Sequence, residues 1–482
     1  MKKYTLGIIL MACIIALSWG GGRSDSSGGS GAAASSGEVV KPTTITWLAD
    51  VLVSEEDGLP QLVAKYKELT GITLDITKPA HNQYMEKVDL TFATGEAPDV
   101  VYIPDATYMQ RYAGNGALVN LNDWYVKYGL DKKFDSKIMD GTRINGGLYI
   151  IPYTGGNGTL TYYRGDWLKE LGMQPPKTYD EFIAMLRGFK KNHPEAVPYT
   201  APGIIQSEFP TYIYTVEFFQ DAVPDYTKVN GKWADGIQQP NMRAAMERWR
   251  SAFAEGLIDK DIVTNNTSAA REKIYAQTAA VMNYWAGPWH QQFNQNLQKN
   301  NPNGVMDPLP AIRGVTYFDR VALGSAISRN SKNPEGVFKY FLGGMFDEGP
   351  LQMLFTHGVE GVHYKMEGGK LIKLPSLSNP AFTNTSGTYI KPELTVAPWA
   401  KDPYELPQAI MPSFNIFRAT AVPAILPPLS AANERFGADI LVARKKFLAD
   451  VVYGNAAFDA ALAAYKTSVG AQVDQVLADY NK

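Results

Sequence analysis

The sequence predicts an α/β protein whose first part is an open, doubly wound parallel sheet. Between residues 43 and 103, short apolar or alternating runs that are typical of strands take turns with longer runs whose apolar residues recur at helical spacing. This strand–helix–strand–helix–strand order favours parallel pairing through right-handed crossovers. A length of 482 residues, of which 45% are hydrophobic and 20% charged, indicates two or three globular domains or one large two-lobed unit.

The predicted elements of this first part follow in order. They are a strand at 43–48, a helix at 57–69 ended by Gly71, a strand at 72–77, a helix at 82–94 ended by Gly95 and a buried strand at 99–103. In doubly wound sheets, ligands bind beyond the carboxyl ends of the strands. This rule places Asp50 and the run Pro104-Asp105-Ala106 on the ligand-facing edge.

The later part of the chain reads as more helical. Thr178 and Glu181 form a capping box before an apolar helix, and Asn333-Pro334 is a second helix start. From residue 429 to the end the pattern is helical again, and prolines between 398 and 428 indicate surface connections.

The N-terminus reads as an export signal. Lys2 and Lys3 precede an apolar run from Leu6 to Leu17, which is too short to span a membrane comfortably. We therefore predict a signal peptide at 1–20, followed by a flexible Gly/Ser-rich linker at 21–42.

Cys13 is the only cysteine, which excludes a disulfide framework and a zinc site built from several thiolates. Leu10-Met11-Ala12-Cys13 loosely resembles a bacterial lipobox, so Cys13 is a candidate for lipidation. The alternative is that Cys13 is an apolar residue inside a signal peptide that is removed near Gly20.

Charge and motif content exclude several functions. The formal net charge is −2 and basic residues are not clustered, so we expect no nucleic-acid partner. The five histidines lack the spacing of a metalloenzyme helix, and phosphate-loop, zinc-protease and G-x-S-x-G motifs are absent. We therefore predict no cofactor and no metal site. Arg164-Gly165-Asp166 spells a cell-adhesion tripeptide, but Asp166 is better explained as a helix N-cap.

Several stretches, taken in order, resemble the bacterial extracellular solute-binding proteins of family 1, which include maltose-binding protein. The stretches are 93–101, 112–121, 163–172, 176–182, 255–259, 280–283, 287–289, 333–335 and 358–364. The signal's displaced cysteine is the one departure, and it bears only on the lipid anchor.

This resemblance implies a type II periplasmic-binding-protein fold. Each of its two lobes would be an open doubly wound sheet flanked by helices, with a ligand cleft between the lobes. It assigns 43–152 and 316–365 to lobe 1, and 153–315 and 366–482 to lobe 2. It also suggests crossings near Ile151 to Tyr153, near Arg313 to Asp319, and after the helix ending near Gly349.

The implied function is that of the substrate-binding component of an ABC importer. Such a protein captures an oligosaccharide or sugar and delivers it to permease subunits in the membrane, without being an enzyme. We expect an exported monomer in the periplasm or on the outer face of the cell membrane. A secreted carbohydrate-active enzyme (a glycoside hydrolase or lyase) and a receptor for a non-sugar ligand are the alternatives.

Aromatic residues make up 12% of the chain, and sugar recognition uses aromatic faces together with polar rims. Trp285 and Trp289 flank a Gly-Pro bend after the strand 280–283, so at least one indole is expected at the ligand, with core packing as the alternative. Trp124, Trp167 and Trp249 lie at helical spacing and are assigned to the core.

The polar candidates are Asp50, Asp105, Asn157 and Glu360. Asp105 is as well explained as a helix cap, and Asn157 as a turn residue among glycines. Glu360 could pair with His363 within its own loop instead of contacting a sugar. Asp99 is expected to be structural, because its carboxylate can bind local amides.

Overall fold

The computed structural model describes residues 38–50, 52–80, 83–103, 106–155, 157–203, 211–378, 380, 390–392 and 395–482. Residues Val40–Lys482 form one compact unit, apart from Met1–Val39. Cys13, the predicted signal peptide and most of the linker lie outside the described residues.

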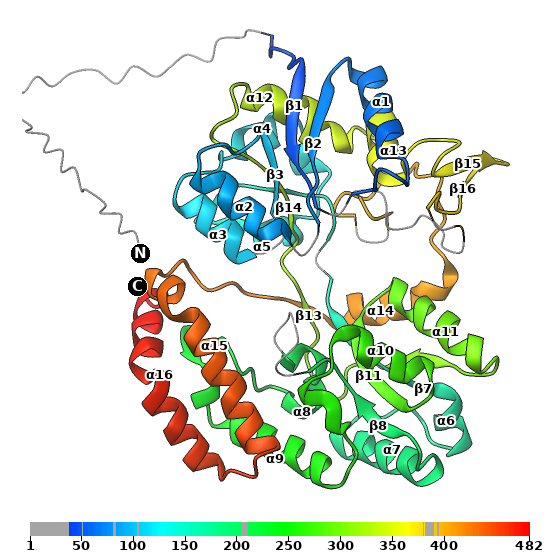
Figure 1. Ribbon diagram of the computed structural model, residues 1–482, viewed down its shortest axis with the longest axis vertical. Coiled ribbons are helices and arrows are strands. Elements are labelled where there is room, and N and C mark those ends of the chain that lie inside the picture. The colour runs from blue at the N-terminus through cyan, green and yellow to red at the C-terminus, as the bar shows by residue number, and fades with distance from the viewer. Residues whose placement is uncertain are drawn as a thin grey trace, which may run out of the picture. The chain divides into compact units, whose positions relative to one another are not determined.

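The first sheet contains the predicted parallel strands. Its order is β2-β1-β3-β14-β6, in which β1 pairs parallel with β2 and β3, while β14 pairs antiparallel with β3 and β6. The strands are β1 (Thr44–Leu48), β2 (Thr73–Thr77), β3 (Val100–Ile103), β6 (Ile151–Pro152) and β14 (Gly324–Ile327). The connecting helices are α1 (Leu59–Thr70), α2 (Tyr84–Ala93) and α3 (Ala106–Gly114) (Figure 1).

Sequence pattern explains this part well. The apolar stripe of α1 buries Leu59, Leu62 and Tyr66, and Gly71 ends the helix in the left-handed conformation. The predicted structural role of Asp99 is confirmed, because its carboxylate accepts hydrogen bonds from the backbone N–H and the hydroxyl of Thr46 at 3.0 and 2.9 Å.

The second sheet is mixed. Its order is β12-β7-β11-β8, with β7 antiparallel to β11 and β12, and β8 parallel to β11. The strands are β7 (Thr159–Arg164), β8 (Val197–Thr200), β11 (Ala279–Trp285) and β12 (Met306–Pro308). Around it lie α6 (Gly165–Glu170), α7 (Tyr179–Asn192), α9 (Asn241–Ala254), α10 (Thr267–Tyr275), α11 (Pro288–Asn300), α15 (Ala431–Val452) and α16 (Phe458–Tyr480) (Figure 1).

The other helices and strands are short. They are α4 (Asn122–Lys127), α5 (Ser136–Gly141), β4 (Arg143–Ile144), β5 (Gly147–Leu148), α8 (Val216–Phe219), β9 (Tyr226–Val229), β10 (Lys232–Asp235), β13 (Phe318–Asp319), α12 (Pro334–Val337), α13 (Pro350–His357), β15 (Tyr364–Glu367), β16 (Lys370–Lys373), α14 (Met411–Thr420) and β17 (Val422–Pro423). The capping box predicted at Thr178 and Glu181 is present at the start of α7.

Each sheet has its own hydrophobic core, and the two cores define two lobes. We call lobe 1 the part packed on the first sheet, whose core draws on residues between 45 and 153 and between 322 and 397. Lobe 2 is packed on the second sheet, and its core draws on residues between 160 and 317 and between 417 and 480. Trp249, in lobe 2, is fully buried, as expected.

The segment after residue 366 packs differently from the expected division. Ile390, Val396 and Ala397 belong to the core of lobe 1, and the Ile390 N–H donates to the Phe355 carbonyl at 2.9 Å. The contact with lobe 1 continues to Asp402, whose carboxylate lies 2.7 Å from His357 Nε2. The expected assignment to lobe 2 is wrong for Ile390, Val396 and Ala397, because sequence periodicity does not show which core a connecting segment covers.

In the described part of the chain, three crossings lead from one core to the other. The first lies between β6 and β7, and the second contains β13. The third lies between Asp402, which is bonded to His357 of lobe 1, and α14. The segment before α15 also contacts lobe 1, where Gln110 Nε2 donates to the Pro427 carbonyl at 2.7 Å. Strand β13 pairs parallel with β17, so the second crossing is hydrogen-bonded to the chain that follows α14.

Candidate functional site

Three of the predicted ligand residues lie at or beside the crossings. Asp50 follows β1 in lobe 1 and is buried, with 5% of its surface exposed. Asn157 lies on the first crossing, and Trp285 ends β11 opposite Thr159, the first residue of β7. The pairing of β7 with β11 therefore brings the indole of lobe 2 next to the first crossing.

Arg320 joins these elements. It follows β13 on the second crossing, and its Nε–H donates to the Asn157 carbonyl at 3.0 Å. Its guanidinium carbon lies 4.2 Å from the centre of the Trp285 ring, a cation–π contact. Sequence reasoning missed Arg320, whose only signal was its position one residue after the expected crossing.

The lobe 1 side of this region is aromatic. The Tyr102 ring, in β3, stacks on the Tyr153 ring with the centroids 6.0 Å apart. Burial, with a smaller contribution from the Asp50 carboxylate, raises the pKa of Tyr102 to about 12, while Arg320 acts in the opposite direction. Leu48 of β1 pairs with Val101 of β3, so Asp50 and Tyr102 lie at the same end of neighbouring strands. We call Asp50, Tyr102, Asn157, Trp285 and Arg320 the crossing site.

Sequence analysis did not assign Tyr102 and Tyr153 to the ligand, although both lie in predicted segments. Tyr102 was treated as part of a buried strand, and Tyr153 as part of a crossing. The available signal was an aromatic residue with a polar hydroxyl next to the end of a strand.

At Gly158 the crossings pack so closely that no side chain can be accommodated. A Cβ on Gly158 would collide with the Phe318 carbonyl oxygen of the second crossing, and would lie 2.6 Å from the Phe417 ring of α14. The Gly158 carbonyl in turn accepts the Ala286 N–H at 2.9 Å. Glycine here allows the crossings and the end of β11 to meet.

Asp319 adds an unusual carboxyl group to the second crossing. Burial raises the pKa of Asp319 to about 6, although Arg320 and Arg418 act in the opposite direction. Its Oδ1 is buried and has no hydrogen-bond partner among the described residues. Its neighbour Tyr317 is buried in the core of lobe 2.

Trp289 lies apart from the crossing site. It is in the first turn of α11, where its ring packs edge-on against Tyr284 with the centroids 4.7 Å apart, and the Arg271 guanidinium lies over it at 4.7 Å. The expected strand 280–283 extends to Trp285, so Tyr284 and Trp285 point to opposite faces of the sheet.

Glu360 does not join the crossing site. Glu360 is exposed and forms an isolated bridge with Tyr364 beside the β15–β16 hairpin. The Nδ1 of His363 accepts the Val359 N–H at 2.8 Å, and its Nε2 lies 2.8 Å from the Asp57 carbonyl, so this ring bonds to backbone. Asp105 lies outside the described residues.

The adhesion-like tripeptide is an internal ion pair. Arg164 is fully buried, and its Nε and Nη2 donate to the two Asp166 carboxylate oxygens at 2.8 and 2.6 Å. The expected N-cap role of Asp166 is wrong, because helix α6 begins one residue earlier, at Gly165, and Asp166 lies in its first turn. A buried, paired arginine is not presented for recognition by another protein.

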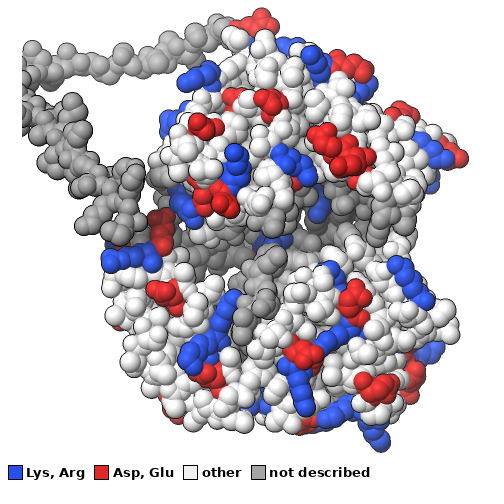
Figure 2. Space-filling view, viewed as in Figure 1, with Lys and Arg blue, Asp and Glu red and all other residues white. Residues whose placement is uncertain are grey.

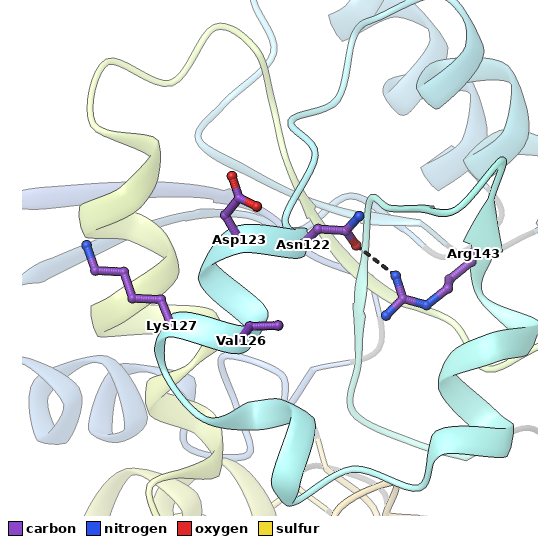
Figure 3. Close-up of a pocket in the computed structure, with 5 residues that line it drawn as sticks. All are labelled: Asn122, Asp123, Val126, Lys127 and Arg143. Atoms are coloured by element: carbon purple, nitrogen blue, oxygen red, sulfur yellow. Dashed lines mark hydrogen bonds between the residues drawn. The ribbon is translucent and has the colours of Figure 1, made fainter. Parts of the chain in front are cut away.

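Two surface hollows lie in lobe 1, away from the crossing site. One, of about 590 Å³, is lined by Asn122, Asp123, Val126, Lys127 and Arg143. Asn122 and Arg143 point toward one another across it and are hydrogen-bonded at 2.7 Å (Figure 3). Lys127 is paired with Glu335 at 2.6 Å. Asn122, Lys127 and Arg143 are thus already bonded within the protein, which makes this hollow a weak candidate for a ligand site.

The second hollow, of about 420 Å³, lies beside α2 and the edge formed by β1 and β2, with Asp75, Lys87 and Glu96 in its wall. On the face shown in Figure 2, acidic and basic side chains are interspersed over both lobes, so this face carries no large field of one sign.

The described part of the chain lacks two other features. None of its helices combines the length and the apolar character needed to cross a membrane. Likewise, no group of three or more His, Cys, Asp or Glu side chains could hold a metal ion there.

Two α/β lobes joined by crossing strands, with aromatic and polar side chains gathered at the crossings, define a two-lobed solute-binding protein. A family model for bacterial extracellular solute-binding proteins matches residues 53–341. This chain belongs to that family.

Individual relatives are distant. Lipoprotein LipO of Bacillus subtilis (strain 168) is 24% identical over 355 residues, which cover 69% of each chain. The polygalacturonan/rhamnogalacturonan-binding protein YtcQ of the same organism is 23% identical over 340 residues, or 66% of each chain, just under two thirds of its length. The solved structure of the N-glycan transport solute-binding protein NgtS from Streptococcus pneumoniae superimposes with a TM-score of 0.66 at 19% identity. It covers 91% of this chain and 98% of NgtS, and shows a shared fold.

Proposed function

We propose that this protein is the extracytoplasmic substrate-binding component of an ABC importer. It captures an oligosaccharide or sugar between its two lobes and delivers it to permease subunits in the membrane. Family membership supports the transport role, and the similarity to the polygalacturonan/rhamnogalacturonan-binding protein YtcQ and the N-glycan transport protein NgtS supports a glycan as the ligand.

The crossing site is the observation that supports a sugar as the ligand. Trp285 from lobe 2 offers an aromatic ring beside Arg320, and Tyr102 and Tyr153 offer stacked rings from the lobe 1 side. A sugar has apolar C–H faces that stack on such rings and hydroxyl rims that hydrogen-bond to carboxylates and amides. Asp50 and Asn157 supply those polar groups.

Within this proposal the predicted residues take different roles. We assign Asp50, Asn157 and Trp285 to the ligand, and Trp289 to packing within lobe 2, because Tyr284 and Arg271 already contact its ring. Asp105 and Glu360 remain candidates for contacts with the outer parts of a longer ligand.

The protein acts as an exported monomer without a cofactor or metal, and it binds the ligand without chemical change. Its membrane attachment is through a lipid on Cys13, or it is released by cleavage near Gly20. Mass spectrometry of the mature N-terminus separates these two outcomes.

A thermal-shift screen followed by calorimetry tests the function. A ligand that binds only the folded state raises stability by RT ln(1 + [L]/Kd). Maltotriose, raffinose, 1-kestose and trigalacturonate sample neutral and acidic glycans. At least one should raise the melting temperature, bind at one site per chain and be recovered intact by chromatography. Recovered fragments would identify an enzyme instead, and a lack of any shift with an extended glycan panel would contradict the sugar assignment.

A further inference from the structure

Arg320 contacts both the first crossing, at Asn157, and the end of β11 in lobe 2, at Trp285. It lies on the second crossing, and hinges in two-lobed proteins are a few residues at element ends that absorb the change in backbone angles. Strand β13 immediately precedes it and pairs with β17. The Arg320 backbone N–H and Nε–H both point to the Asn157 carbonyl of the first crossing, at 3.4 and 3.0 Å.

The same side chain sets the environment of the Trp285 ring. The guanidinium lies over the indole at 4.2 Å, and the described aromatic partner of the ring is Tyr214, edge-on with the centroids 6.4 Å apart. A planar guanidinium stacks on a ring in a defined orientation, which a flexible ammonium does not.

The backbone of Trp285 is held independently by lobe 2. Its carbonyl accepts a hydrogen bond from the Tyr162 hydroxyl at 2.9 Å. That hydroxyl also bonds to Ser413 Oγ at 2.8 Å, and Ser413 Oγ accepts the Gly287 N–H at 2.8 Å. The main chain of Trp285 therefore follows lobe 2, while its indole contacts a side chain that follows the crossings.

We propose that Arg320 is a positioning residue that couples lobe closure to the orientation of the Trp285 indole. Rotation about the crossings moves the guanidinium relative to lobe 2, and the stacked ring moves with it toward the ligand. This inference rests on the proposed function, since it assigns Arg320 a role at the same site.

A double-mutant cycle between Arg320 and Trp285 tests this coupling. Arg320→Met keeps an apolar side chain of similar reach but removes the charge and the Nε–H donor. We expect it to weaken binding of the tightest panel glycan at least tenfold, whereas in a Trp285→Phe background the same change should alter Kd less than twofold. If instead the Arg320 and Trp285 substitutions change Kd independently, so that their factors multiply in the double variant, Arg320 does not act through Trp285 and the proposal is overturned.

A ligand-free measurement covers the case in which no panel glycan binds. The fluorescence of Trp285 is isolated as the difference between a protein and its Trp285→Phe partner, because the chain has nine tryptophans. Loss of the guanidinium should make this component more accessible to acrylamide. Unchanged accessibility would overturn the coupling, whereas changed accessibility without glycan binding would leave the coupling intact and contradict the sugar function alone.

Two further variants serve as controls for this experiment. Arg320→Lys retains the charge but not the planar fork, so its effect should lie between wild type and Arg320→Met, and it replaces Arg320→Met if that protein fails to fold. Arg435→Met removes a guanidinium that lies 4.9 Å from the Phe436 ring on α15. It should leave Kd and Trp285 accessibility unchanged, and an effect equal to that of Arg320→Met would contradict the proposal.

Discussion

The Tyr162 hydroxyl donates a hydrogen bond to the Trp285 carbonyl at 2.9 Å, which fixes the end of β11 to the core of lobe 2. Tyr162 is fully buried, and burial holds the pKa of its phenol far above the usual range. The last residue of this strand thus has a rigid backbone and a half-buried indole. A rigid base with a partly exposed ring suits a residue that stacks on a ligand.

Trp289 should behave as a packing residue. Its half-buried ring contacts Tyr284 and Phe293, so Trp289→Ala should lower the free energy of unfolding by about 2 kcal/mol or more. The affinity for a bound glycan should stay within about threefold of wild type. Denaturant unfolding and calorimetry on the same preparation check this, and a large loss of affinity at unchanged stability would return Trp289 to the ligand site.

Gly158 should tolerate no side chain. In Gly158→Ala the new Cβ would collide with the Phe318 carbonyl and press on the Phe417 ring, so we expect a destabilisation of about 1–3 kcal/mol. Gly141→Ala is the matched control, because a Cβ there meets nothing within 4 Å. The control should be neutral or slightly stabilising. Equal melting temperatures for the two variants would show that the crossings are not tightly packed at Gly158.

Glu217 should make stability depend on pH. Burial raises its pKa from 4.5 to about 7, although a hydrogen bond donated by the Thr161 hydroxyl opposes the shift; Tyr199 and Tyr317 also lie beside the carboxyl. Because the folded state holds this proton more tightly than the unfolded state, its contribution to stability is complete below pH 4.5. That contribution falls as the pH rises toward 7 and is lost above it.

The size of this effect can be measured against a variant. Between pH 4.5 and 7, each pH unit lowers the free energy of unfolding by about 1.4 kcal/mol, so the total loss amounts to about 3 kcal/mol. Glu217→Gln has no proton to lose, and the difference in unfolding free energy between it and wild type should change by that amount between pH 4.5 and 7.5. A pH-independent difference would show that Glu217 titrates normally.

The Arg164–Asp166 pair should contribute strongly to folding. Asp166→Ala leaves a fully buried guanidinium without its carboxylate, and breaking such a pair destabilises by about 3–5 kcal/mol. Glu68→Ala breaks the exposed pair with Lys65 and should change stability by less than about 1 kcal/mol. Similar losses in both variants, measured by urea unfolding, would contradict the structural role of Asp166.

Sequence reasoning succeeded where local pattern decides structure. The elements between residues 43 and 103 were predicted in type and order, because α1 and α2 carry clear apolar stripes and end next to Gly71 and Gly95. The structural role of Asp99 also followed from its place beside a strand.

It failed where contacts join distant segments. Arg320 and Asn157 are 163 residues apart, and no spacing rule links them. The same holds for Ile390, whose N–H bonds to Phe355 of lobe 1. Three of the five residues of the proposed crossing site, Asp50, Asn157 and Trp285, were therefore predictable from strand ends and glycine-rich turns. Arg320 and Tyr102 needed the folded arrangement.

Calorimetric titration of wild type and Trp285→Ala with the tightest-binding panel glycan tests the central claim most directly. We expect binding at one site in wild type and a loss of about 2–4 kcal/mol of binding free energy in the variant. That loss is roughly thirtyfold to a thousandfold in Kd, with the melting temperature little changed. Wild-type affinity in a folded Trp285→Ala protein would show that the ligand does not bind at the crossing site.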